Sequence, residues 1–550
     1  MSDTLNVCLI DPQPLIAVAF RTLGHVVLTL VTGKQSFFDL PQALEEQGFV
    51  PDLVVQTEIL ANRTVLTGLD RVACPTVFWA MDPHLNAHWH SLYARLFDCI
   101  CSTQRGWIPH FRKQGVADVR WLPMFGRVEP WVDMQERAHD LAFVGRVSRQ
   151  RPARGWMIEF LEAQGKDHSL AIESSLAYED MMALYRGSRI VPNESIFGEV
   201  NFRLFEGASC GCLVLSQALG DEQEALFEPG REFDTYANIV ELDEKLSMYM
   251  KNTRLVQAMG RAARERLQAE HLPRHRVERL VEYGREVGRH RACGAEAAKW
   301  QALTVVAMWE AGALDVSTQD VLARLASVEQ DDDVAAALLR ALAAAKVTPL
   351  LVENLNAILG ARLYTESPDL NLAGSMAALR VNHWDGAKAF WYRHLEATLA
   401  RPCNPPENPQ QQLMLWAKEL KRSGHILRAG FGYDPQMHLP ATAVECLMTI
   451  LDSEPEHLPT LKLLDTLLRP IAGVEPARLG YLSMLTLHER RDWRLAFEIG
   501  LANLKSYRLA SGLEELRLAR EMALDKGQGA VFDKALAARD GSGLLAARLD

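Results

Sequence analysis

Residues 189–236 gather the polar side chains best suited to hold a ligand that carries hydroxyl groups and phosphate. In the stretch RIVPNESIFGEVNFRLFEGASCGC, Asn201 opens a helical pattern that also carries Arg203 and Glu206. A carboxylate accepts hydrogen bonds from a diol, and a fixed cation or a helix N-terminus binds phosphate. An isolated Arg-x-x-Glu pair is more often a surface pair that stabilises its helix by about 0.2–0.5 kcal/mol. Apolar Phe205 and Ala208 flank Glu206, which favours the ligand site over the surface pair.

A second phosphate-binding candidate is the loop that follows the apolar run DLAFV at 140–144. Gly145 and Arg146 come directly after this run, and Arg149 follows three residues later. A glycine lets backbone amides approach phosphate closely, and either arginine supplies charge. A single glycine in this position is also common at the ends of ordinary strands.

A histidine-rich segment, WAMDPHLNAHWHSLY at 79–93, offers groups for proton transfer. Asp82 and His84 are the candidates, because histidine titrates near neutral pH and an aspartate accepts a proton or orients the imidazole. The alternative role for Asp82 is to cap a helix over 85–96. His88 and His90 have neither a cysteine nor an H-E-x-x-H pattern beside them, so a zinc site is not predicted. Gln104 and Arg105, after the next apolar run, are weaker candidates.

These segments are positioned by short apolar runs that alternate with helical patterns. Runs that are apolar on both faces predict parallel strands at 5–10, 25–31, 52–56, 76–81, 98–102 and 119–125, and a second series at 140–147, 168–173, 189–193 and 212–216. We therefore expect two Rossmann-like α/β lobes, residues 1–136 and 137–293, with a ligand cleft between them.

Beyond residue 293 the strand pattern stops and amphipathic helices follow. Large apolar residues at helical spacing alternate with small ones, such as Ala387, Ala443 and Ala496, as in stacked helical hairpins. Residues 294–550 are predicted to form an αα-solenoid of the tetratricopeptide kind, with an ordinary helical domain as the alternative. The Pro-rich stretch at 401–410 interrupts the array.

The chain resembles group 1 glycosyltransferases of the two-lobed GT-B fold, in particular the spore-maturation-protein-like branch with its N-x-R-x-F-E…A-x-G-x-L motif. The matching residues are Asn201, Arg203, Phe205, Glu206, Ala208, Gly211 and Leu213, followed by Glu224, Phe227, Pro229 and Gly230. The segments 140–151 and 254–282 fit the same family. The resemblance extends to the first lobe only by topology and does not reach the helical part.

The resemblance implies transfer of a sugar from a nucleotide-sugar donor, a UDP- or GDP-sugar, to an acceptor hydroxyl, with Asp82 and His84 as catalytic candidates. It implies a donor site made by Gly145, Arg146, Arg149, Asn193, Asn201, Arg203 and Glu206. Glu206 would take the ribose hydroxyls, and Arg203 would stabilise the departing diphosphate. No cofactor is implied, nor a divalent cation, because the run DDD at 331–333 is typical of a helix start. The expected acceptor is a protein such as flagellin, or a glycan, engaged in part by the helical region.

Two alternatives stay open. Many retaining enzymes of the class carry two glutamates eight residues apart, but Gly198 stands eight before Glu206 and Glu199 is one residue out of register. The stereochemical outcome is therefore open, and a degenerate transferase acting as a protein-binding scaffold is the main alternative. A sugar-nucleotide epimerase is the other, and it requires no helical extension.

The composition excludes other classes. The chain has 550 residues, 48% of them hydrophobic and 23% charged, as in globular proteins with more than one core. The formal net charge of -11 argues against nucleic acid as a partner. No run of 18 apolar residues and no signal peptide occur, so we expect a cytoplasmic protein without an integral membrane segment. The nine cysteines, including the pairs Cys99/Cys101 and Cys210/Cys212, are expected as core residues in a reducing compartment.

Overall fold

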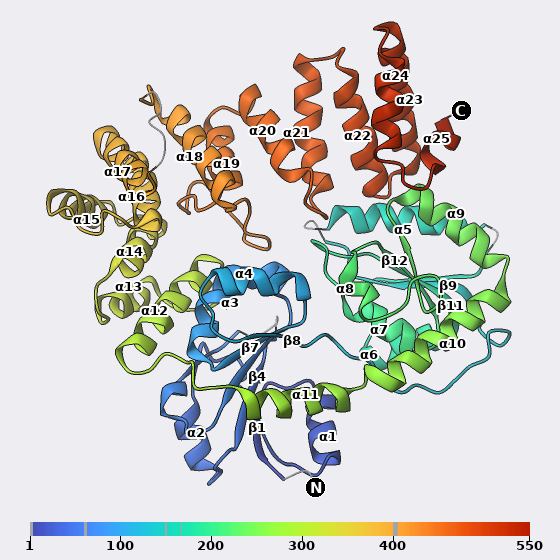
Figure 1. Ribbon diagram of the computed structural model, residues 1–550, viewed down its shortest axis with the longest axis horizontal. Coiled ribbons are helices and arrows are strands. Elements are labelled where there is room, and N and C mark those ends of the chain that lie inside the picture. Colours follow the sequence, from blue (N-terminus) through green and yellow to red (C-terminus); the bar gives the residue numbers. More distant parts are fainter. Residues whose placement is uncertain (1–3, 60–62, 149–150, 167, 400–404, 550) are drawn as a thin grey trace. The chain divides into compact units, whose positions relative to one another are not determined.

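The computed structural model describes residues 4–59, 63–148, 151–166, 168–399 and 405–549, which fold into two compact units (Figure 1). The first unit comprises residues 1–123 and 277–460, and the second comprises 124–276 and 461–550. The chain leaves one unit for the other after Pro123, Arg276 and Thr460. The predicted helical domain, residues 294–550, is thus shared between the two units.

A parallel sheet forms the centre of the first unit, with strand order β2-β1-β4-β6-β7-β8. Its strands are β1 (Asn6–Ile10), β2 (Val26–Leu30), β4 (Leu53–Thr57), β6 (Thr76–Ala80), β7 (Cys99–Ser102) and β8 (Val119–Trp121). All six predicted strands are present, although β8 ends at Trp121 rather than at Phe125. Every residue of β4, β6 and β7 is buried, as expected for strands covered on both faces.

The helices that accompany this sheet begin where the sequence supplies proline or a capping side chain. Pro14 and Pro83 stand in the first turn of their helices, where the missing N–H costs nothing. The helices are α1 (Pro14–Thr22), α2 (Leu40–Glu46), α3 (Pro83–Tyr93) and α4 (Ile108–Lys113), and α11 (Pro273–Glu286) leads the chain back toward this sheet. The small parallel pair β3 (Phe37–Asp39) and β5 (Val65–Thr67) was not predicted, because these three-residue strands are not part of a longer apolar run.

The first part of the helical region completes the core of the first unit. Trp300, Leu303 and Val306 of α12 share one apolar cluster with Ile10 and Phe78 of the sheet. The helices are α12 (Ala295–Glu310), α13 (Thr318–Ala326), α14 (Asp332–Ala344), α15 (Thr348–Gly360), α16 (Pro368–Arg380), α17 (Trp384–Ala397), α18 (Pro409–Ser423) and α19 (Ala443–Ser453). The DDD run lies at the start of α14 as predicted, where the Asp331 carboxylate caps Val334 N–H at 3.0 Å.

The second unit is built on a parallel sheet of order β10-β9-β11-β12-β13. Its strands are β9 (His139–Val144), β10 (Leu170–Glu173), β11 (Ser188–Asn193), β12 (Leu213–Gln217) and β13 (Asp234–Tyr236), of which only β13 was not predicted. The accompanying helices are α5 (Pro152–Gln164), α6 (Tyr178–Arg186), α7 (Phe202–Ser209), α8 (Asp221–Glu224), α9 (Ile239–Met250) and α10 (Thr253–Glu270).

The last helices belong to the same core as this second sheet. Trp493, Phe497 and Leu516 lie in one apolar cluster with Leu213 of β12 and Leu246 of α9. These helices are α21 (Glu475–His488), α22 (Trp493–Lys505), α23 (Leu509–Asp525), α24 (Gly529–Ala537) and α25 (Leu544–Leu549), and α20 (Leu458–Leu468) spans the boundary at Thr460. Helices from the far end of the chain therefore complete the core of the second unit, where α22 and α25 pack against α9.

The helix-rich C-terminal region and the predicted core positions are confirmed. Successive helices pack as pairs, including α16 with α17, α18 with α19, and α21 with α22. Ala387, Ala443 and Ala496 are all buried in these packings. A solenoid of the tetratricopeptide kind stays a prediction. Cys99, Cys101, Cys210 and Cys212 are buried free thiols, and none of the helices in the described ranges is long and apolar enough to cross a membrane.

Candidate functional site

The second sheet places its switch point between β9 and β11. The chain continues from β9 to β10 on one side and then crosses to β11 on the other. Ligands of open α/β sheets bind outside the carboxyl ends of the strands at such a point. Val144 and Asn193 end these two strands, so the predicted residues Gly145 and Asn193 stand at this position.

Arg203, the second residue of α7, links the two strand ends. Its Nη1 donates to Asn193 Oδ1 at 2.9 Å, and its Nη2 donates to the Val144 carbonyl at 2.9 Å. The guanidinium also lies 4.7 Å from the centre of the Phe143 ring. Burial lowers the pKa of Arg203, but the Tyr185 hydroxyl and the carboxylates of Glu194 and Glu206 outweigh it, so its pKa is raised. A fixed positive charge is thus held at the switch point.

Asn201 is the N-cap of α7, as predicted. Its Oδ1 accepts from Arg203 N–H at 3.2 Å, and its Nδ2 donates to the Glu194 carbonyl at 3.0 Å. The cap therefore fixes the start of α7 to the residue that follows β11. A helix start placed in this way presents backbone dipoles to an anion.

Glu206 lies on α7 three residues after Arg203 and is half-buried. Burial raises its pKa to about 7 against the opposing effects of Arg203 and Arg127. Within the described ranges its carboxylate forms no hydrogen bond or ion pair. Carboxylates removed from water are normally paired, so this one is available to ligand hydroxyl groups.

The loop after β9 holds the remaining donor-side candidates. Gly145 is buried and its N–H donates to the Glu173 carbonyl at 2.9 Å, while a Cβ there would lie 2.9 Å from Cε1 of Phe143. Arg146 is exposed and its carbonyl accepts from Arg154 Nη1 at 3.3 Å. Arg149 lies outside the described residues.

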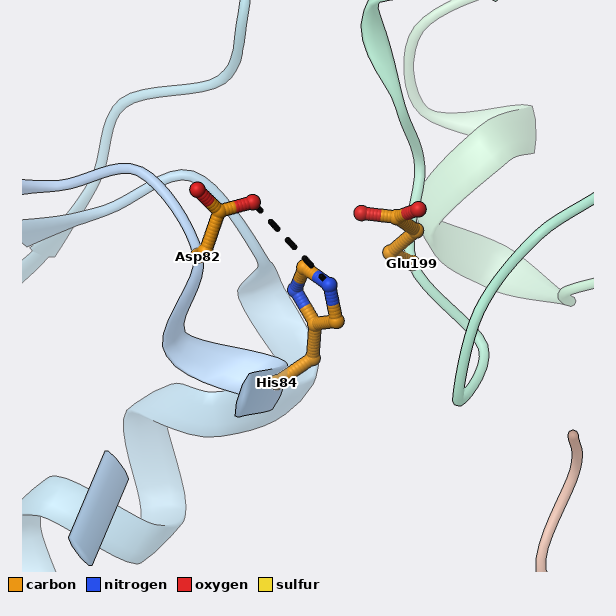
Figure 2. Close-up of side chains that lie close together, drawn as sticks. All are labelled: Asp82, His84 and Glu199. Atoms are coloured by element: carbon orange, nitrogen blue, oxygen red, sulfur yellow. Dashed lines mark ion pairs between the residues drawn. The ribbon is translucent and has the colours of Figure 1, made fainter. Parts of the chain in front are cut away.

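The loop between β11 and α7 explains the missing first glutamate. Gly198 has a φ of 78°, a left-handed conformation that favours glycine over any residue with a side chain. Glu199, drawn in Figure 2, is the buried residue that follows it, and its carbonyl accepts from Ser195 Oγ at 2.8 Å. The carboxylate is therefore displaced from the expected position by a turn.

In the first unit, Asp82 and His84 lie together at the start of α3, just beyond the carboxyl end of β6 (Figure 2). Asp82 Oδ1 lies 4.0 Å from His84 Nε2. Asp82 occupies the N-cap position, but its side chain makes no capping hydrogen bond. Asp82 is therefore the N-cap of α3 by position, as the alternative expected, but without a capping hydrogen bond from its side chain, and its carboxylate lies beside the His84 imidazole.

Glu58, which follows β4, was not predicted and holds this pair in place. Its Oε2 accepts from the N–H groups of Met81 at 2.8 Å and Asp82 at 2.9 Å. Its Oε1 accepts from Asn86 Nδ2 at 2.7 Å and lies 3.0 Å from His90 Nε2. Burial raises the pKa of Glu58, but His90, the Asp82 N–H and Arg63 outweigh it, so the pKa lies below its usual value.

The other histidines of α3 are packing residues. His90 is buried beside Glu58, and His88 packs edge-on against Phe431 with 5.5 Å between ring centres. Burial and Arg428 lower the pKa of His88 to about 3, so it is neutral at physiological pH. Of the weaker candidates, Gln104 is buried and bonded to Ser102, and Arg105 is exposed, with its guanidinium 5.6 Å from the centre of the Trp121 ring.

Residues 132–282 match the family described as Glycosyl transferase-like. This part of the chain includes every donor-side residue predicted above, from Gly145 to Glu206. It includes neither Asp82 and His84 nor the helices beyond α11. No curated protein matches the chain.

Solved structures give weaker likenesses. An alpha-glucosyltransferase in complex with UDP-glucose and DNA containing an abasic site is 11% identical, with a TM-score of 0.39 over 52% of this chain and 100% of that one. Sucrose-phosphate synthase from Thermosynechococcus elongatus is 10% identical, with a TM-score of 0.37 over 51% and 98%. HepE from Anabaena in complex with UDP-glucose is 13% identical, with a TM-score of 0.35 over 50% and 98%. TM-scores below 0.5 establish neither a shared fold nor a shared ligand.

Within the glycosyl transferase-like region, the buried pair of Arg154 and Glu194 was also missed by sequence reasoning. Arg154 of α5 donates from Nε and Nη2 to Glu194 Oε2 at 2.8 and 2.5 Å. The pair joins the first turn of α5 to the loop after β11, next to the switch point. The partners are 40 residues apart in sequence, so no local spacing could reveal them.

Proposed function

We propose that the protein transfers a sugar from a nucleoside-diphosphate sugar to an acceptor hydroxyl. The observation that supports this most is the state of the Glu206 carboxylate. It is half-buried, it forms no hydrogen bond or ion pair with the described residues, and it lies three residues after Arg203, whose positive charge is fixed. A carboxylate and a cation at the end of a parallel sheet suit the diol and diphosphate of such a donor. The family match over residues 132–282 points to the same class of ligand.

In this proposal the second unit holds the donor, a UDP- or GDP-sugar. Glu206 accepts hydrogen bonds from the ribose hydroxyls, and the start of α7 with Arg203 faces the diphosphate. The backbone at Gly145 and the side chain of Arg146 line the same sheet end. Negative charge grows on the nucleotide as the glycosidic bond breaks, and a fixed cation stabilises that charge without reorganising. No metal ion is needed for these roles.

The first unit supplies the group that accepts the proton of the acceptor hydroxyl. His84 takes the proton and the Asp82 carboxylate, 4.0 Å away, orients the ring and stabilises its positive charge. Glu58 fixes the backbone of Asp82 and so sets this geometry. The acceptor is a hydroxyl of a protein or a glycan, and the helices of the C-terminal region contribute to holding it.

A nucleotide panel tests the donor class. We would measure the melting temperature with UDP, GDP, dTDP and CMP for the wild type, Glu206→Ala, and Glu159→Ala, an exposed residue of α5 that serves as a matched control. We expect one nucleotide to stabilise the wild type and the control but not Glu206→Ala. Equal stabilisation of Glu206→Ala would remove Glu206 from the site, and no stabilisation by any nucleotide would favour a protein-binding scaffold.

A further inference from the structure

The turn between α22 and α23 brings a tyrosine of the helical region to the donor side of the second unit. Tyr507 is buried and has a φ of 66°, a left-handed conformation that residues with side chains rarely adopt. Its hydroxyl oxygen lies 2.9 Å from that of Tyr236, the last residue of β13. A buried residue in such a conformation is held there by its surroundings.

The hydrogen bonds give this contact a direction. Tyr236 Oη donates to the Asn193 carbonyl at 2.9 Å, so its single proton is already used. Tyr507 must therefore donate to Tyr236. Asn193 in turn accepts from Arg203 through Oδ1 at 2.9 Å, and its Nδ2 donates to Ser216 Oγ at 3.0 Å. Two hydrogen bonds in series thus lead from Tyr507 to the main-chain carbonyl of Asn193, and the side chain of the same Asn193 accepts from the guanidinium of Arg203.

A second contact joins the helical region to the segment that follows β11. Gly473, in the turn before α21, has a φ of 84°, and a Cβ at this position would lie 2.8 Å from the backbone N of Phe197. Phe197 itself has a positive φ of 51°. The left-handed turn at Gly473 is therefore packed against the segment that follows β11, and the left-handed turn at Tyr507 contacts the end of β13.

We propose that Tyr507 is a positioning residue for the donor site. It holds Asn193 in place, and Asn193 in turn holds Arg203 where the diphosphate binds. This rests on the proposed donor site. The hydrogen bonds from Tyr507 to Tyr236 and from Tyr236 to Asn193 are buried, and hydrogen bonds in series polarise one another. The helical region is then part of the donor-binding machinery as well as a surface for the acceptor.

The test measures UDP and GDP affinity by calorimetry for wild type, Tyr507→Phe and Tyr249→Phe. Tyr249 is the matched control, because its hydroxyl donates to Asp234 Oδ2 at 2.7 Å in the same unit but has no link to Asn193. Tyr507→Phe removes one buried hydrogen bond, so we expect its nucleotide affinity to be about 3- to 10-fold lower than that of the wild type. Tyr249→Phe should change the affinity by less than about twofold.

A double-mutant cycle distinguishes a positioning role of Tyr507 from a purely structural one. In Arg203→Lys, which keeps the charge but loses the bond to Asn193, adding Tyr507→Phe should cause no further loss of affinity. Should Arg203→Lys not fold, amide exchange over residues 193–198 should be faster in Tyr507→Phe than in Tyr249→Phe. Equal affinities of the two tyrosine variants, or a full effect of Tyr507→Phe beside Arg203→Lys, would overturn the inference alone. Failure of wild type to bind either nucleotide would overturn the proposed function with it.

Discussion

At the scale of single residues, the site depends on charges that the fold holds away from water. Arg203 is fixed by Asn193 and the Val144 carbonyl, whereas Glu206 is half-buried and meets no hydrogen-bond donor among the described residues. The motif N-x-R-x-F-E pointed to both residues, whereas their spacing of three on one helix is also common in surface pairs. It could not reveal Glu58, Glu194 or Arg154, because each acts through a partner that is distant in sequence.

The raised pKa of Glu206 predicts a pH-dependent stability. The pKa rises from 4.5 to about 7 on folding, so between these values the folded state binds more protons than the unfolded state. Stability therefore falls as the pH rises through this window, by about 1–3 kcal/mol for a half-buried group. The melting temperature of Glu206→Gln relative to wild type should increase between pH 5 and pH 7.5. A difference that does not change with pH would contradict the shift.

Replacing Glu58 should damage the first unit. Glu58→Ala leaves the N–H groups of Met81 and Asp82, the Asn86 amide and His90 without their acceptor. Removing one member of such a buried network costs about 3–5 kcal/mol. Urea unfolding should show this loss, while Glu45→Ala, an exposed position on α2, should unfold like the wild type. If Glu58→Ala unfolds at the same urea concentration as the wild type, Asp82 is positioned in another way.

At the scale of elements, the sequence predicted ten of the strands because runs that are apolar on both faces are typical of buried parallel sheets. It missed β3, β5 and β13, which have three residues each and, unlike the equally short β8, are not part of a longer apolar run. Helix starts followed from proline and capping residues, as at Pro83 and Asn201. The end of β8 was predicted too late because residues 122–125 are apolar and buried without being paired in the sheet.

The turn after α7 gives a test of a single element. Gly211 has a φ of 65°, and a Cβ there would lie 2.6 Å from Cζ3 of Trp131. Gly211→Ala should therefore destabilise the second unit by about 2–4 kcal/mol, from backbone strain and overpacking. Gly155→Ala on α5 is the control, since its Cβ would meet nothing closer than 3.8 Å and helix propensity favours alanine by about 0.5–1 kcal/mol. Thermal melts of the two variants should move in opposite directions.

At the scale of the whole molecule, the sequence showed a change from α/β to helical patterns near residue 293 but not where the helices pack. Trp300 completes the core of the first sheet, and Trp493 and Phe497 complete that of the second. Amphipathic periodicity shows that a helix has a partner without identifying the partner. No local sequence pattern therefore marks Thr460 as the point where the chain passes from the first unit to the second.

Truncation tests this arrangement. A chain ending at residue 460 loses α21–α25 and exposes the apolar face of the second unit, so we expect it to be insoluble or to bind no nucleotide. A chain ending at Asp540 loses only α25, with the buried Leu545 and Leu549, and should stay soluble with a lower melting temperature. Recovery of a stable, nucleotide-binding chain that ends at residue 293 would show that the α/β part folds independently of the helices.

The late position of the helices that complete the second core also has a consequence during synthesis. The second sheet and α9 are synthesised by residue 250, but α22 and α25, which pack against α9, come from residues 461–550. At about 5–20 residues per second, the uncovered face waits on the order of 15–60 seconds for them. The nascent chain is therefore expected to need a chaperone over this interval, and premature termination before α22 should mark the product for degradation.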